Sequence, residues 1–169
     1  MVGYKYGVSK YGKKRGPVIQ MIKVKWLIYL FKIHINMEGL IHHIEINVSD
    51  LQKSKEFWEW LLTEKLSYKK YQEWHSGISF KLGETYIVFV QTDEKHLDNK
   101  YNRRETGLNH LAFHCSTRDF VDTLTIELKE KNINILYTDK HPFAGGANYY
   151  AVFFEDPDRI KVEVVATGK

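Results

Sequence analysis

Two stretches of the chain repeat the same pattern of hydrophobic and polar positions. Residues 40–48 and 108–115 each alternate apolar and polar side chains, as a half-buried strand does. Each stretch is followed by a helical pattern, which begins near Ser49-Asp50 in the first half and near Ser116 in the second. Three more strand-like runs then follow each helix. The repeat predicts a βαβββ unit that occurs twice.

The predicted fold class is α+β. The two modules cover about residues 38–92 and 107–166, and the polar residues between them form the connection. The expected strands after the helices are residues 66–71, 77–82 and 85–91 in the first module, and 133–137, 148–154 and 160–165 in the second. We expect the sheets to form a cupped half-barrel with the helices outside.

Strand alternation puts a set of polar side chains on the sheet faces that point away from the helices. This set comprises His43, Glu45, Asn47, His110, His114 and Glu163. A single histidine on a strand is more often an ordinary hydrogen-bonded residue. His43 and His110, however, occupy the same slot of the repeat. With Glu163 they form the donor set of a divalent metal site, and Zn, Fe, Mn, Ni and Co all suit these donors.

Other polar residues are candidates for binding or catalysis. Glu45 lies two residues after His43 on the same face, where it can act as a general base or as a further donor. The alternative is a carboxylate that is simply paired within the cavity. The candidates for substrate binding are Asn47, Gln91, His114, Tyr149 and Tyr150.

Three motifs together resemble the vicinal-oxygen-chelate superfamily, which includes glyoxalases, bleomycin resistance proteins and extradiol dioxygenases. They are residues 43–50 with Ser54 and Phe57-Trp58, residues 107–110, and residues 153–158 followed by Glu163. The resemblance covers roughly residues 38–166. It implies one divalent metal held by His43, His110 and Glu163, a small-molecule substrate and a homodimer.

The chain departs from this family pattern at two positions. Glyoxalase I enzymes use a fourth ligand, a glutamate on the last strand of the first module. Setting the halves in register puts Phe89 there, or Val88 if the register shifts by one, and neither binds a metal. The glycine that usually follows Asp-Pro-Asp is Arg159, so this turn must tolerate a side chain.

The resemblance leads us to expect a metal-dependent enzyme that acts on a small oxygen-rich molecule. Lyase or isomerase chemistry of the lactoylglutathione-lyase type is the first expectation. A fosfomycin-type thiol transferase, an extradiol dioxygenase and a non-catalytic drug-binding resistance protein are the alternatives.

Charge is distributed unevenly along the chain. The net charge is +4, but residues 1–36 hold eight basic residues and no acidic ones. The rest of the chain carries 17 basic and 21 acidic residues, a net charge of −4. This mildly acidic domain argues against nucleic acid as a partner. The single cysteine, Cys115, excludes an intramolecular disulfide and suits a cytoplasmic location.

Residues 1–36 are expected to be a basic leader outside the fold, with the domain starting near Met37. A basic amphipathic element that lies on a membrane or packs on the domain is the second possibility. The longest uncharged apolar run there is residues 26–31, whereas a bilayer span needs about 20 residues. We therefore do not expect membrane contact through this segment.

Overall fold

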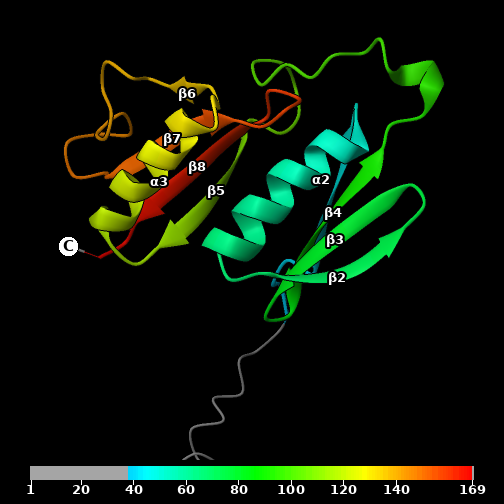
Figure 1. Ribbon diagram of the computed structural model, residues 1–169, viewed down its shortest axis with the longest axis horizontal. Coiled ribbons are helices and arrows are strands. Elements are labelled where there is room, and N and C mark those ends of the chain that lie inside the picture. The colour runs from blue at the N-terminus through cyan, green and yellow to red at the C-terminus, as the bar shows by residue number, and fades with distance from the viewer. Residues whose placement is uncertain (1–37, 169) are drawn as a thin grey trace, which may run out of the picture. The chain divides into compact units, whose positions relative to one another are not determined.

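The computed structural model describes residues 38–168, so the predicted leader lies outside the described residues. The described part consists of two βαβββ modules (Figure 1). The first contains β1 (His43–Val48), α2 (Leu51–Glu59), a π-helical turn (Trp60–Lys65), β2 (Lys69–Trp74), β3 (Gly77–Leu82) and β4 (Thr85–Gln91). The second contains β5 (His110–Cys115), α3 (Arg118–Glu130), β6 (Ile135–Leu136), β7 (Ala151–Glu155) and β8 (Lys161–Ala166). A short 3₁₀ turn, Glu94–His96, lies in the connection.

Each module forms its own four-stranded mixed sheet. The strand orders are β1-β4-β3-β2 and β5-β8-β7-β6, so the first and last strands of each module are parallel neighbours. The predicted fold class and the two modules are confirmed. The two sheets remain separate, however, and do not close into a barrel.

The first helix begins at the predicted Asp50, and the second begins at Thr117, one residue after the predicted Ser116. The Asp50 side chain accepts a hydrogen bond from the Lys53 backbone N–H at 3.1 Å, and the Thr117 side chain accepts one from the Phe120 N–H at 3.2 Å. After α2 the chain widens into the π-helical turn. Trp60, Leu61 and Leu62 are all buried there, so this turn adds a broad apolar surface to the core.

Three predicted strands begin or end elsewhere, and the backbone shows why. Ser67 has φ of +62°, so β2 starts only at Lys69. Tyr137 has φ of +56°, which ends β6 after two residues. Tyr149 donates a backbone hydrogen bond to the Gly146 carbonyl, so this part of the chain is a turn and β7 starts at Ala151.

One hydrophobic core joins the two modules. Trp58 of α2 stacks on Phe89 at 4.7 Å between ring centroids and also contacts Phe113 of the second module at 6.4 Å. Trp58, Phe89 and Phe154 are fully buried. Within residues 38–168, no helix is both long and apolar enough to cross a membrane.

The turn between β7 and β8 makes polar contacts with the first module. Trp58 Nε1 donates a buried hydrogen bond to Asp156 at 3.2 Å. The Ser49 backbone N–H donates to Asp158 at 3.0 Å, and the Ser49 hydroxyl also donates to it. This short turn therefore contacts the β1–α2 connection and the last turn of α2, and it ties one module to the other.

Candidate metal and substrate site

His110 and Glu163 lie on the neighbouring parallel strands β5 and β8. Ala112 is paired with Glu163, so His110 lies one pleat away on the same face. His110 Nε2 is 3.1 Å from Glu163 Oε2. The Glu163 side chain is only 4% exposed, whereas His110 is 34% exposed, so the pair opens to solvent from the histidine side.

Further side chains contact both members of this pair. The Tyr149 hydroxyl donates a hydrogen bond to Glu163 Oε1, and this bond raises the pKa of the phenol to about 12. His110 Nδ1 lies 2.9 Å from Asn109 Oδ1. One carboxylate oxygen and one imidazole nitrogen are thus engaged by the protein, while Oε2 and Nε2 face each other.

A small apolar cluster surrounds Glu163 on its sheet. Phe153 of β7 is paired with Glu163, and Tyr137 packs edge-on against Phe153 at 5.5 Å between ring centroids. The cluster consists of Ala151, Phe153 and Val165, with Leu136 and Ala144 packed against it. A carboxylate in apolar surroundings is costly unless it is paired or binds a cation.

His43 is the first residue of β1 and does not contact the His110–Glu163 pair. Its ring stacks on Tyr86 at 4.9 Å with an interplanar angle of 6°, and its Nδ1 is 2.9 Å from His42 Nδ1. Within residues 38–168, no three His, Cys, Asp or Glu side chains lie close enough to hold one metal ion. A single chain therefore brings together two of the three predicted ligands.

The strand register identifies the first-module counterpart of Glu163. Glu163 pairs with Ala112, and the corresponding pair in the first module is Val88 with Glu45. Val88 occupies the slot, and Phe89, which the sequence alignment of the halves favoured, lies under α2 instead. In the second module the carboxylate lies on the last strand, as Glu163 of β8. In the first module it lies on the neighbouring first strand, as Glu45 of β1.

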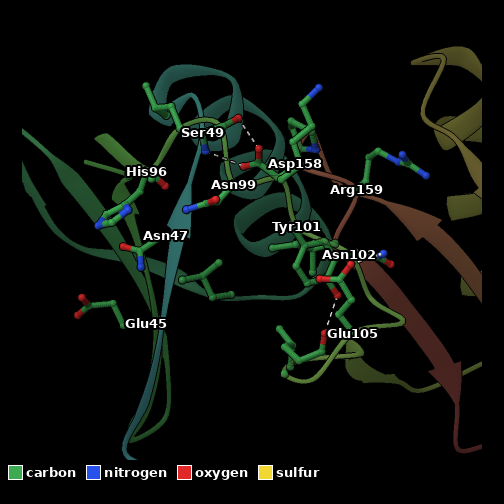
Figure 2. A pocket seen from close by; sticks show the side chains of 18 of the residues that line it. Glu45, Asn47, Ser49, His96, Asn99, Tyr101, Asn102, Glu105, Asp158 and Arg159 are labelled. Carbon is green, nitrogen blue, oxygen red and sulfur yellow. Dashed lines mark hydrogen bonds between the residues drawn. The ribbon is translucent and has the colours of Figure 1, made fainter. Parts of the chain in front are cut away.

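A cavity of about 700 Å³ lies beside Glu45 and Asn47. Figure 2 shows both side chains on the same side of β1, with His96 from the connection close to Asn47. The cavity is also lined by the connection and by the Pro157–Ile160 turn, with Lys100, Tyr101 and Arg159 among its residues. His43, His110 and Glu163 do not line it.

The remaining predicted substrate residues lie in different environments. Asn47 and His114 are exposed on the faces away from the helices. Gln91 Oε1 accepts a hydrogen bond from the Leu51 N–H at 2.9 Å, so its amide is engaged at the start of α2. The Tyr150 hydroxyl donates to Asp122 of α3 at 2.7 Å, which directs it away from Glu163.

Residues of the connection support the second half of the site, and sequence reasoning missed them. Arg103 pairs with the buried Glu155 of β7, and the Arg103 carbonyl accepts a hydrogen bond from Asn109 Nδ2 at 2.8 Å. The Tyr101 hydroxyl donates to the Leu108 and Asn109 carbonyls. In the sequence the connection is only a polar stretch without periodicity, and the one available signal is an asparagine directly before a candidate ligand.

Comparison with protein families agrees with this architecture. The model of the Glyoxalase/Bleomycin resistance protein/Dioxygenase superfamily matches residues 40–164, and the chain belongs to this superfamily. The resemblance seen in the three sequence motifs is thereby confirmed.

Individual relatives match about three quarters of the chain. The chain is 56% identical over 126 residues to the uncharacterized protein YqjT of Bacillus subtilis (strain 168), covering 75% of this chain and 98% of YqjT. It is 28% identical over 124 residues to the glutathione transferase FosA of Serratia marcescens, covering 73% and 78%. A crystal structure of a protein from Bacillus halodurans, proposed to be a glyoxalase, has 56% identity and a TM-score of 0.75, covering 77% and 97%.

Proposed function

We propose that this protein is a metal-dependent enzyme that isomerises or cleaves a small molecule bearing two neighbouring oxygens. The proposed ligands are His43, His110 and Glu163, which suit Zn, Fe, Mn, Ni or Co. A divalent ion held there supplies a Lewis acid that stabilises negative charge on the substrate oxygens. The observation that carries this proposal is the His110–Glu163 pair at 3.1 Å, with its nearly buried carboxylate.

The donor chemistry of this pair fits a cation. The Nε2 and Oε2 atoms face each other, and both are acceptors when the imidazole is neutral and protonated at Nδ1. Two acceptors at this distance repel each other unless a cation lies between them. A proton or a metal ion meets this need, and the open side of His110 admits either.

We infer that His43 of a second copy completes the site. His43, Glu45 and Asn47 on β1 and Ala112 and His114 on β5 are exposed, so these two strands are uncovered on the side away from the helices in one chain. Several large apolar side chains are exposed as well, namely Leu40, Ile41, Tyr71, Trp74, Tyr137, Phe143 and Tyr149. A homodimer that places the first module of one copy against the second module of the other covers these faces and gives two sites.

Glu45 is the proposed general base. It is paired with Val88, which occupies the position that corresponds to Glu163 in the repeat. Its side chain makes no hydrogen bond or ion pair within residues 38–168. An ionised carboxylate there takes the proton from the carbon that bears one substrate oxygen and returns it to the neighbouring carbon. Bonds and electrons balance within such an isomerisation. Asn47, His114 and Tyr149 are proposed to contact the substrate.

Thiol addition is the second candidate reaction. Two observations favour it: the similarity to FosA, and the valine in the slot where a fourth ligand would lie. In this case Glu45 assists deprotonation of the thiol instead of a carbon acid. Oxygenation of a diol is tested as a further outcome, and binding of a drug without catalysis would give no turnover on the same panel.

The shared site is tested by complementation. His43→Ala and Glu163→Ala chains are each expected to lose most of their metal and their activity. Mixed dimers assembled from both chains should regain metal, because one of their two sites receives His43 from one chain and the His110–Glu163 pair from the other. No recovery on mixing, or a light-scattering mass of one chain, would contradict a shared site.

The reaction is tested with metal-reconstituted full-length protein. The panel consists of methylglyoxal–thiol adducts, fosfomycin with thiols, and catechols with oxygen uptake followed electrochemically. Glu45→Gln should keep its metal and lose turnover of the adducts, whereas Glu105→Gln, a carboxylate lining the same cavity, should keep both. Turnover of catechols alone, or full activity of Glu45→Gln, would overturn the proposed reaction.

A further inference from the structure

The last residue of the connection between the modules, Asn109, contacts the Nδ1 atom of the candidate metal ligand His110. Asn109 is exposed and directly precedes β5, and its Oδ1 lies 2.9 Å from His110 Nδ1. An imidazole that binds a metal through Nε2 needs its proton on Nδ1. The group that faces Nδ1 therefore decides which nitrogen is free.

The orientation of the Asn109 amide is set by its other contact. Asn109 Nδ2 donates to the Arg103 carbonyl at 2.8 Å, and a carbonyl can only accept. The oxygen of the amide must then be the atom that faces His110. Because an amide oxygen also only accepts, the hydrogen bond between the two side chains requires a proton on His110 Nδ1.

Arg103 and Tyr101 hold Asn109 in place. The Arg103 guanidinium pairs with Glu155, which is 8% exposed and also accepts a hydrogen bond from Asn134 at 2.7 Å. The Tyr101 hydroxyl donates to the Asn109 carbonyl at 3.1 Å. Although Asn109 lies at the surface, its backbone and its amide are both anchored to buried or half-buried residues.

In the first module, too, the residue directly before the candidate metal ligand contacts the Nδ1 atom of that ligand. His42 precedes His43, and their Nδ1 atoms are 2.9 Å apart. The Tyr86 backbone N–H donates to the His42 carbonyl, and the Tyr86 ring stacks on His43. In both modules, the residue before the candidate ligand thus faces its Nδ1 atom.

We propose that Asn109 is a positioning residue that keeps the proton of His110 on Nδ1 and so presents Nε2 as the free nitrogen. The importance of this role for metal binding rests on the proposed function. The placement of the proton itself does not, because it is inferred from the contacts of Asn109 with the Arg103 carbonyl and with His110 Nδ1. Partners of ligand histidines typically change metal affinity by about 10–100-fold when they are removed.

The placement of the proton is tested without metal. In a Glu163→Ala background the competing acceptor at Nε2 is absent, and ¹H–¹⁵N spectra of the full-length protein report which nitrogen of the neutral His110 ring carries the proton. We expect the proton on Nδ1 in Glu163→Ala and on Nε2 in Glu163→Ala with Asn109→Leu. A proton on Nε2 in the Glu163→Ala protein overturns the proposal.

Metal affinity provides the second readout. With Zn²⁺ and a competing indicator, Asn109→Leu should bind about 10–100-fold more weakly than the natural chain. Asn109→Asp keeps an acceptor at Nδ1 but loses the donor to Arg103, so near-natural affinity is expected for it. Asn102→Leu is the matched control, because Asn102 makes hydrogen bonds only within the connection.

The two readouts separate the possible failures. Weak binding by both Asn109→Leu and Asn109→Asp indicates that Asn109 only supports the loop, and this result overturns the positioning role. If the natural chain binds no metal while the proton moves from Nδ1 to Nε2 as expected, the proposed function fails and the positioning role stands.

Discussion

Asp156 provides a quantitative prediction about stability. Its carboxyl group is 4% exposed and accepts hydrogen bonds from Trp58 Nε1 and from the Asp158 and Ile160 backbone N–H groups. Burial raises the pKa of this group from 3.8 to about 7, because desolvation penalises the charged form more than these donors favour it. A shift of about 3 units corresponds to about 4 kcal/mol as an upper limit.

The sign of the pH dependence follows from proton binding. Between pH 4 and 7 the folded chain holds the Asp156 proton and the unfolded chain has released it. The free energy of unfolding therefore falls as the pH rises through this window, and the stability gained from the protonated group is lost above pH 7. A carboxyl group with a lowered pKa would instead make the free energy of unfolding rise with pH, at pH values below about 4.

Urea unfolding of the natural chain and of Asp156→Asn at pH 5 and pH 8 tests this reasoning. The natural chain should lose up to about 3 kcal/mol between these pH values relative to Asp156→Asn, whose amide cannot ionise, because about two of the three pH units of the shift lie above pH 5. Asp98→Asn, which changes an exposed carboxylate, should follow the natural chain. Parallel curves for Asp156→Asn and the natural chain would refute a buried protonated Asp156.

Three further predictions concern the candidate site and the turn beside it. Tyr149→Phe should weaken Zn²⁺ binding about tenfold in a competition titration, because Glu163 loses a hydrogen bond, whereas Tyr150→Phe should have no effect. Gly145→Ala should weaken binding similarly, since its Cβ would lie 2.3 Å from the Tyr149 ring. Arg159→Gly should raise the free energy of unfolding by about 1 kcal/mol in urea, because Arg159 has φ of +67° and its exposed side chain makes only a long contact, 3.8 Å, with Glu155. Unchanged metal affinity would contradict the first two predictions. A lower free energy of unfolding would contradict the third.

The sequence was sufficient to predict the two modules because each short signal was local. The alternation on β1 and β5 and the caps before α2 and α3 depend on neighbours in the chain. The register between β1 and β4 depends on residues far apart in the chain. Alignment of the two halves therefore put Phe89, instead of Val88, at the position that corresponds to Glu163. A shift of one residue turns a side chain to the opposite face of a sheet, and only the pairing of the strands determines it.

The candidate site could be predicted in part for the same reason. Alternation placed His110 and Glu163 on one face, and the structure brings them together. It did not reveal that His43 lies apart from them in one chain, because this depends on how the modules pack. The role of Asn109 depends on the fold of the connection, which has no periodic pattern to read.

The Asp156–Asp158 turn connects the part of the proposed site on the first module, His43, with the part on the second module, His110 and Glu163. It contacts Ser49 and Trp58 of the first module and leads directly into the strand that carries Glu163. In the proposed dimer each chain gives one half to each of two sites, so a shift of either module is transmitted to both. Ligand binding at one site should then change the affinity of the other, with a coupling free energy that is equal in both directions.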